Sequence, residues 1–267
     1  MYLVLNAHSC LRWFQYSLLS TSPQIMQHPI TEKPVLVTGA TGFIATYTVK
    51  QLLAHGYKVR GTVRSLKKKE SYQYLLDFPN AETNLELVEA DLLSPNAFDA
   101  AAQGCEYILH LASPFSLTVS DPQKDLVDPA VKGTLSILEA SVKVGGIKRI
   151  VITSSFAAVT DSPQSGKIYT ENDWNTTSTL KRNPYYLSKT LAEKAATDFA
   201  KRDDFKQTGT ELVFINPGLV IGPTYRNDVN GSVETLQAIL NGGFPAIINL
   251  GWAMVDVRDC VCFDSSN

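Results

Sequence analysis

Tyr185 and Lys189 stand four positions apart in a stretch with a helical pattern, and together they could perform acid–base chemistry. On a helix this spacing puts both side chains on one face. An ammonium beside a phenol stabilises the phenolate and lowers its pKa from ~10, so the phenol can deliver a proton to a carbonyl oxygen. Tyr186 lacks such a partner, because the residue four positions after it is Thr190. The spacing therefore predicts that Tyr185 is a general acid.

Ser154 and Ser155 follow an apolar run at 149–153 that is typical of a buried strand. A serine hydroxyl at a strand end can hold a carbonyl oxygen while negative charge develops on it. A Tyr-x-x-x-Lys pair by itself is usually only part of a helix surface. It becomes specific here because its helix follows a Ser-Ser strand end, provided that the same fold holds a redox cofactor.

A glycine-rich turn at 38–45, Thr-Gly-Ala-Thr-Gly-Phe-Ile-Ala, meets that condition. Gly39 and Gly42 permit a tight turn and a close approach of the backbone to a pyrophosphate, and the following helix offers its N–H groups and positive dipole end. The usual third glycine is Ala45 here, which is still small enough for helix–strand packing. A strand before the turn and a helix after it favour a dinucleotide-binding loop over an ordinary structural turn.

Arg64 follows the strand predicted at 57–63 and indicates which dinucleotide binds. NAD needs a carboxylate at this strand end for its ribose 2′-hydroxyl, and the sequence has none there. A guanidinium can instead hold a 2′-phosphate through two hydrogen bonds and stack on adenine. The predicted cofactor is therefore NADP(H), whereas the lysines at 67–69 are expected to form a solvated turn.

The elements around these residues alternate between apolar strands and amphipathic helices. Strands are predicted at 35–37, 57–63, 85–90, 107–111, 149–153 and 211–215, and helices at 47–55, 97–103, 126–144 and 185–201. Such alternation specifies an α/β fold with a doubly wound parallel sheet, the Rossmann fold, in which ligands bind at the carboxyl ends of the strands. We expect an irregular N-terminal extension at 1–33, a cofactor-binding domain at 34–225 and the start of a substrate-binding region at 226–267.

The composition argues against several other classes of protein. Of the 267 residues, 44% are hydrophobic and 19% charged, and the net charge of −2 provides no field for nucleic acids. The four cysteines match no metal-site spacing, so no metal is expected. No signal peptide or membrane-spanning run is predicted. We therefore expect a cytoplasmic protein whose partner is a small molecule.

Several motifs resemble those of the extended short-chain dehydrogenases/reductases, the NAD-dependent epimerase/dehydratase superfamily. The matching segments are 38–45, 61–64, 91–92, 111–115, 153–155, 185–196 and 216–223. Within this superfamily the sequence is most similar to dihydroflavonol 4-reductases, cinnamoyl-CoA reductases and fungal NADPH-dependent aldehyde/ketone reductases. The resemblance extends over about 35–259 and implies reduction of an aldehyde or ketone to an alcohol by a Ser-Tyr-Lys triad.

The resemblance also implies roles for individual residues. Ser155 is the expected catalytic hydroxyl, with Ser154 as the alternative. The implied cofactor-binding residues are Gly39, Thr41, Gly42, Phe43, Ile44, Arg64, Asp91, Leu92, Leu111, Ala112, Ser113, Tyr185, Lys189, Pro217, Gly218, Val220 and Ser232. Asp91 and Leu92 would flank the adenine, 111–113 would border the nicotinamide, 217–220 would pack on it, and Ser232 would lie near the phosphates.

Two departures from the family pattern leave alternatives open. Ala130 stands where many short-chain dehydrogenases have an asparagine that orders a water near the lysine. The chain also ends soon after 254–259, where relatives continue, so we expect a truncated substrate lobe. One alternative to the reductase is therefore a truncated NADP-binding protein with little turnover. A sugar-nucleotide epimerase or dehydratase is another, although Arg64 and 111–115 resemble the reductases; the substrate and the oligomeric state stay open.

Overall fold

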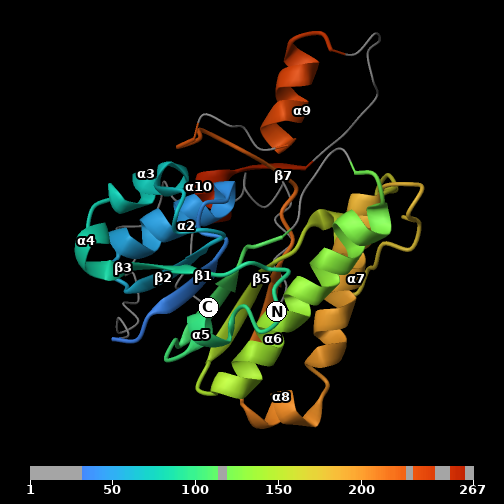
Figure 1. The fold of residues 1–267 in the computed structure, drawn as a ribbon. Coiled ribbons are helices and arrows are strands. Elements are labelled where there is room, and N and C mark those ends of the chain that lie inside the picture. Colours follow the sequence, from blue (N-terminus) through green and yellow to red (C-terminus); the bar gives the residue numbers. More distant parts are fainter. Residues whose placement is uncertain (1–31, 114–118, 227–230, 244–252, 262–267) are drawn as a thin grey trace, which may run out of the picture.

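A parallel sheet forms the centre of the molecule, with helices on both of its faces (Figure 1). The computed structural model describes residues 32–113, 119–226, 231–243 and 253–261. The expected N-terminal extension up to residue 31, residues 114 and 115 of the reductase-like motif, and Cys262 lie outside these ranges.

The six strands of the sheet are arranged in the order β3-β2-β1-β4-β5-β6, and each neighbouring pair is parallel. They are β1 (Val35–Thr38), β2 (Val59–Val63), β3 (Leu85–Glu89), β4 (Tyr107–His110), β5 (Arg149–Thr153) and β6 (Glu211–Ile215). The order reverses between β1 and β4, where Thr38 pairs with His110. This reversal creates the crevice in which doubly wound folds bind ligands. The predicted Rossmann fold is confirmed.

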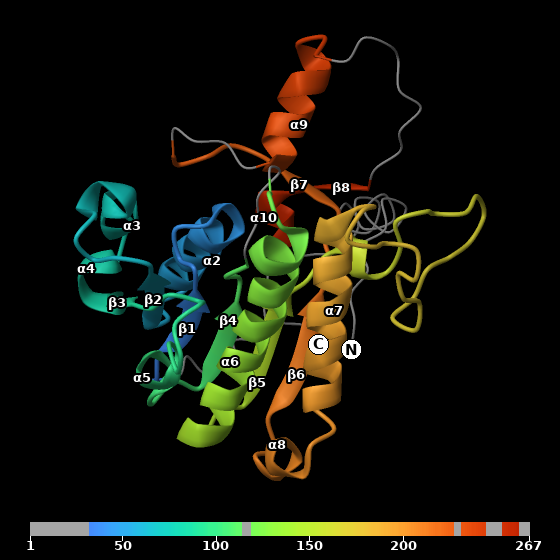
Figure 2. The same ribbon diagram turned by 45° about the vertical axis from the view of Figure 1, so that its right-hand side comes forward.

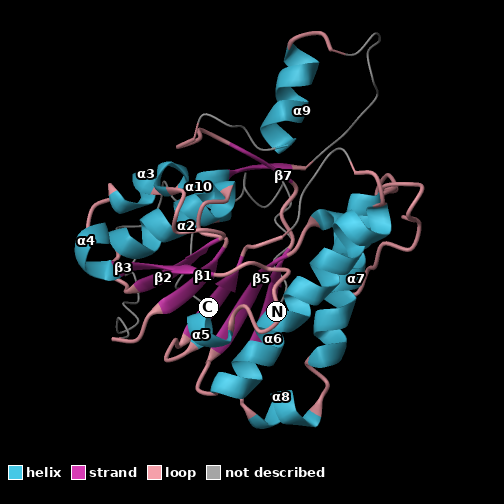
Figure 3. Cartoon of the chain, viewed as in Figure 1, coloured by secondary structure: helices cyan, strands magenta, loops and turns pink. Residues whose placement is uncertain are grey.

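Helices cover the two faces of the sheet (Figure 3). They are α2 (Phe43–Ala54), α3 (Gln73–Leu76), α4 (Ala81–Asn84), α5 (Asp99–Ala102), α6 (Asp128–Val144), α7 (Pro184–Phe199), α8 (Asp203–Gln207), α9 (Gly231–Leu240) and α10 (Val257–Cys260), with short turns η1 (Lys69–Ser71), η2 (Gln123–Val127) and η3 (Phe156–Ala158). Side chains alternate between the faces of a strand. Leu36 and Ile150 therefore pack with α5 to α8, whereas Val37 packs with α2, α3 and α4 on the other face.

Helix α2 begins at Phe43, earlier than the predicted residue 47. The pattern at its start was obscured because the buried side chains there include Thr46 and Thr48, which are polar. Their hydroxyls donate to the carbonyls of Gly42 and Ile44, one turn back, and so are satisfied inside the helix. Strand β2 conversely begins at Val59, later than the predicted residue 57.

A second, two-stranded parallel sheet joins β7 (Leu219–Ile221) to β8 (Met254–Asp256). Beyond it, Val257 of α10 is fully buried in a cluster with Tyr47 of α2. A Cβ on Gly218 would lie 2.1 Å from the carbonyl oxygen of Ala253, so only glycine permits this approach. Residues 257–261 are thus anchored to α2, whereas α9 projects away from the large sheet beside β7 (Figure 2).

None of the helices in the described ranges combines the length and the hydropathy of a membrane-spanning segment.

Candidate active site

The glycine-rich loop joins β1 to α2 in the geometry of a phosphate-binding turn. Gly39 has a φ of 64°, a conformation that favours glycine, and its N–H donates to Thr62 Oγ1 at 2.9 Å. A Cβ at Gly39 would lie 3.1 Å from the Ala112 Cα atom, so β4 and the loop meet closely here. Gly42 follows as the N-cap of α2, and no side chain caps this helix. The first N–H groups of α2 are therefore available to an anion.

Arg64 lies at the carboxyl end of β2 with its side chain exposed. It forms no ion pair with any residue of the described ranges. Glu89, at the end of β3, instead accepts a hydrogen bond from the backbone N–H of Leu66 at 2.9 Å. No carboxylate of the described residues therefore pairs with this guanidinium, which has the geometry to hold a phosphate through two hydrogen bonds.

One hydroxyl group links the end of β1 to the residues that follow β4. Thr38 Oγ1 accepts hydrogen bonds from the N–H groups of Leu111 at 3.1 Å and Ala112 at 3.0 Å. It lies 3.0 Å from His110 Nδ1, and with its acceptor sites taken its own proton goes to that nitrogen. His110 is thus a neutral tautomer with its proton on Nε2. Consistent with this, burial and the nearby Lys189 charge lower the pKa of His110 to about 3.

Asp91 and Leu92 follow β3 and differ in exposure. The Asp91 carboxylate is exposed and accepts a hydrogen bond from the Leu93 N–H at 3.0 Å. Leu92 packs on α6, where a Cβ added to Gly133 would come within 2.5 Å of it.

The three predicted catalytic residues lie together at the carboxyl ends of the strands. The Ser155 side chain hydrogen-bonds the hydroxyl group of Tyr185. Lys189 Nζ donates to Ser113 Oγ at 3.1 Å and lies 3.5 Å from the carbonyl oxygen of Thr153. The same ammonium is 5.9 Å from the centroid of the Tyr185 ring. The helical spacing therefore does place Tyr185 and Lys189 on one face of α7.

The expected lowering of the Tyr185 pKa is wrong for this structure. Burial raises the pKa of Tyr185 to about 12, although the hydrogen bond from Ser155 acts in the opposite direction. Burial therefore outweighs any stabilisation of the phenolate by the ammonium, whose Nζ atom lies 5.9 Å from the centroid of the Tyr185 ring. Burial lowers the pKa of Lys189 to about 8, while the charge of Glu193 opposes that shift.

The two adjacent serines have different partners. Ser155 faces Tyr185, whereas Ser154 Oγ donates to the carboxylate of Glu193 in a buried contact. Asn216 Nδ2 donates to the same Glu193 oxygen at 2.8 Å. Glu193, Asn216 and His110 were not predicted from the sequence as site residues. The only available signal was the position of Glu193, four residues after Lys189 on the same helix face.

A small cavity of about 20 Å³ lies beside the lysine. Its lining includes His110, Ala130, Thr134, Lys189 and Glu193. The cavity is large enough for about one water molecule. Ala130, the position at which this sequence departs from many short-chain dehydrogenases, is thus part of the wall next to Lys189.

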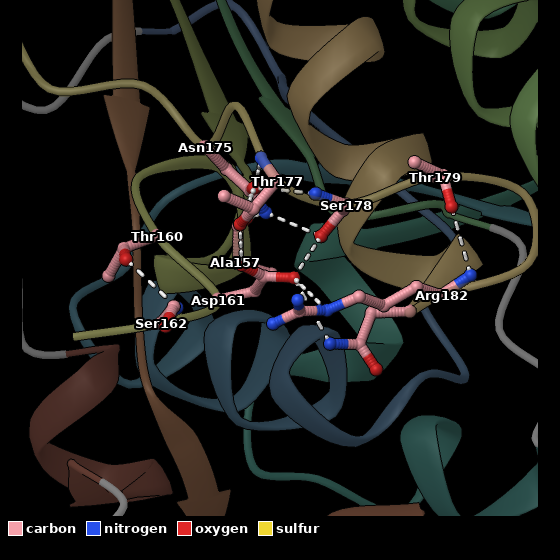
Figure 4. A network of polar contacts seen from close by, with 10 residues as sticks. Ala157, Thr160, Asp161, Ser162, Asn175, Thr177, Ser178, Thr179 and Arg182 are labelled. Carbon is pink, nitrogen blue, oxygen red and sulfur yellow. Dashed lines mark hydrogen bonds and ion pairs between the residues drawn. The ribbon is translucent and has the colours of Figure 1, made fainter.

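The loop before α7 is organised by the carboxylate of Asp161, whose side chain is fully buried (Figure 4). It accepts hydrogen bonds from Thr177 Oγ1, from Ser178 Oγ at 2.7 Å and from Asn183 Nδ2 at 3.2 Å, and Arg182 lies 3.5 Å away. Burial alone would raise the pKa of Asp161, but these hydrogen bonds hold it below its ordinary value. Asn183 directly precedes α7, so Asp161 fixes the point at which the Tyr185 helix begins.

The remaining predicted cofactor residues lie farther along the chain. The carbonyl oxygen of Pro217 accepts a hydrogen bond from the Phe156 N–H at 2.9 Å, next to the serine pair. Val220 is buried in the cluster of Tyr47 and Val257. Ser232 lies on α9, which contacts β7. Contacts of these residues with a nicotinamide or a phosphate stay predictions.

Comparison with known proteins places this site in a family. Residues 35–259 match the NAD dependent epimerase/dehydratase family. The chain is 40% identical to cinnamoyl-CoA reductase CAD2 of Medicago truncatula over 84% of this chain and 69% of that protein. It is also 40% identical to a dihydroflavonol 4-reductase of Arabidopsis thaliana, over 76% of this chain but only 53% of the relative.

Solved structures give the same relationship. The yeast methylglyoxal/isovaleraldehyde reductase Gre2, complexed with NADPH, superposes with a TM-score of 0.75 at 31% identity. The match covers 85% of this chain and 72% of the yeast chain. Gre2 of Candida albicans, also in complex with NADPH, gives a TM-score of 0.74 at 39% identity. The matched fold and the motifs at its strand ends lead to one conclusion: this chain belongs to the NAD dependent epimerase/dehydratase family.

Proposed function

We propose that the protein is an NADPH-dependent oxidoreductase that reduces an aldehyde or ketone to an alcohol. The observation that carries the proposal is the joined hydroxyl pair of Ser155 and Tyr185, with the Lys189 ammonium beside the phenol ring. This group lies at the carboxyl ends of the strands, at the same edge as the glycine-rich loop.

The chain has the features that an NADP molecule requires. The left-handed Gly39, the uncapped N-terminus of α2 and the exposed Arg64 would hold the pyrophosphate and the 2′-phosphate. Lys189, turned toward Ser113, would meet the nicotinamide ribose. When bound, the cofactor supplies the hydride.

The residues of the triad then divide the remaining work. With a pKa of about 12, Tyr185 keeps its proton at neutral pH and can donate it to the carbonyl oxygen. Ser155 hydrogen-bonds the same oxygen as negative charge develops there. The Lys189 ammonium stabilises the phenolate that remains after the proton has left.

The relatives support this assignment by what their names say. The curated ones include a cinnamoyl-CoA reductase and a dihydroflavonol 4-reductase, and both Gre2 structures contain NADPH. A sugar-nucleotide enzyme is the weaker candidate. The structure of MoeE5 with UDP-glucose and NAD matches at 26% identity and a TM-score of 0.62.

The test is a screen of aldehydes and ketones in which the consumption of NADPH is monitored by its absorbance. We expect turnover with at least one carbonyl compound, and its loss in Tyr185→Phe. NADPH binding without turnover on any compound would favour the alternative of a cofactor-binding protein. Turnover of a UDP-sugar without net NADPH consumption would favour the epimerase.

A further inference from the structure

Glu193 is a buried carboxylate that the proposed reaction does not use. It is only 4% exposed and lies on α7, one turn beyond Lys189 and two turns beyond Tyr185. Acidic side chains are almost never fully buried unless they are paired. Its partners therefore indicate why the fold retains it.

The partners of Glu193 come from two strand ends. Ser154 Oγ, just after β5, donates to Glu193 Oε2. Asn216 Nδ2, just after β6, donates to the same oxygen at 2.8 Å and to the backbone carbonyl of Ser155 at 3.1 Å. One carboxylate thus ties the serine that faces Tyr185 to the helix that carries Tyr185 and Lys189. A shift of Glu193 would change the separation of all three groups.

The charges around Lys189 indicate a second role for Glu193. The lysine is 7% exposed, and the titratable side chains that face it are Tyr185 and Glu193 on its own helix and His110 on β4. His110 is neutral, as its hydrogen bond with Thr38 requires. Tyr185 keeps its proton at neutral pH.

The other elements packed against Lys189 add no charge. Thr153 at the end of β5 and Ser154 just after it face the lysine, as do Ala130 and Thr134 of α6, and η3 is uncharged. The charged side chains of η2 are exposed, whereas its buried residues are apolar. In the part of the chain that the structure describes, Glu193 is therefore the one carboxyl group facing the ammonium. Burial raises the pKa of Glu193, whereas the hydrogen bonds from Ser154 and Asn216 and the charge of Lys189 act against that rise and favour the carboxylate.

We propose that Glu193 is a positioning residue that fixes Ser155 against the Tyr185 helix and supplies the buried counter-charge for the Lys189 ammonium. This inference rests on the proposed function only where it concerns turnover. It commits to a direction: the Glu193 charge favours the protonated lysine, and its removal favours the neutral amine. Water screens the pair little, because Lys189 and Glu193 are only 7% and 4% exposed.

The decisive variant is Glu193→Gln, which keeps the shape and an acceptor oxygen for Ser154 and Asn216 but removes the charge. Burial already lowers the pKa of Lys189 to about 8, and loss of the Glu193 charge, one helical turn away, should lower it further by about one unit. We expect the alkaline fall of the reduction rate to move to lower pH by the same amount. Glu193→Asp, which keeps the charge, should restore part of the shift.

Ser154→Ala is the matched control, because it removes a hydrogen bond from the same carboxylate and leaves the charge in place. It should lower the melting temperature of the protein. The pH at which the reduction rate falls on the alkaline side should move much less than in Glu193→Gln. A purely structural role for Glu193 predicts the same behaviour for Glu193→Gln. If Glu193→Gln lowers the melting temperature but leaves the pH of the alkaline rate decrease unchanged, the proposal is overturned.

A readout without substrate separates this inference from the proposed function. The ¹³Cε resonance of Lys189, identified by its loss in Lys189→Met, reports the lysine titration directly. A lower midpoint in Glu193→Gln supports the counter-charge even if no carbonyl compound is turned over, in which case only the proposed function fails. An unchanged midpoint, together with wild-type turnover, refutes the counter-charge alone.

Discussion

The Nζ atom of Lys189 lies 5.9 Å from the centroid of the Tyr185 ring, whereas the hydroxyl of Tyr185 is hydrogen-bonded to Ser155. The ammonium and the serine thus contact different parts of the phenol. The two contacts are therefore separate: Ser155 hydrogen-bonds the phenol oxygen, and the Lys189 ammonium lies toward the ring, where it could stabilise the charge of a phenolate.

The first prediction compares the two adjacent tyrosines. Tyr185→Phe removes the proton donor but keeps the ring, so NADPH binding should survive while turnover falls ~10²-fold or more, as for loss of a general acid. Tyr186→Phe is the control, because Tyr186 has no lysine one turn on. Steady-state rates of the two variants, measured with the same carbonyl substrate, test this prediction. Loss of turnover in Tyr186→Phe with an active Tyr185→Phe would show that the helical spacing was misinterpreted.

The elements that the sequence predicted well are those whose pattern is set by burial alone. Strands β5 and β6 begin and end at the predicted residues, since each is a short apolar run between polar turns. Strands β7 and β8 pair over a long sequence separation, and the pairing of β7 could not be read from three residues. The start of α2 was missed because buried threonines interrupt its apolar pattern.

The residues of the candidate site were likewise predicted only in part. Spacing identified Tyr185 and Lys189, because a helix brings residues four apart onto one face. It could not show that burial outweighs the ammonium and raises the pKa of Tyr185 to about 12. Glu193 was missed because an acidic residue on a helix is ordinarily solvated. Its role depends on Asn216, which only the folded sheet brings to it.

The second prediction concerns the choice of cofactor. Arg64→Ala should weaken NADPH binding by about 1.5–3 kcal/mol, the range for a charge-assisted contact, and leave NADH binding nearly unchanged. Lys67→Ala is the control, since this exposed lysine belongs to the turn expected to be solvated. Fluorescence titration with both cofactors measures the effect. Equal losses for NADPH and NADH would remove Arg64 from the 2′-phosphate site.

The third prediction tests how the loop before α7 positions the acid. Asp161→Asn places an amide N–H among groups that donate to the carboxylate, so it should destabilise the protein by about 1–3 kcal/mol. A small displacement of Asn183 and of the Tyr185 helix should also slow turnover at least ~10-fold while NADPH affinity is kept.

Arg182→Gln is the control and should change stability and turnover little, because the Arg182–Asp161 ion pair is long and the arginine side chain is 56% exposed. Denaturant unfolding and steady-state kinetics give the two readouts. Destabilisation with unaltered turnover would confine Asp161 to stability.

The last prediction uses the separation between the pKa values of the lysine and the phenol. At about 8, Lys189 loses its proton long before Tyr185, whose pKa is about 12. The wild-type reduction rate should therefore fall as the pH rises through about 8, because the phenolate then lacks its cation while the proton donor is intact. Lys189→Met should be slower at every pH below that point, since it lacks the cation from the start. Its rate should also show no decrease near pH 8, so that the alkaline decrease moves toward the pH at which Tyr185 titrates.

Measurement of kcat/KM from pH 6 to pH 10 for both proteins tests the assignment. A limb that persists near pH 8 in Lys189→Met would mean that a different group titrates there, and the alkaline decline could no longer be attributed to Lys189.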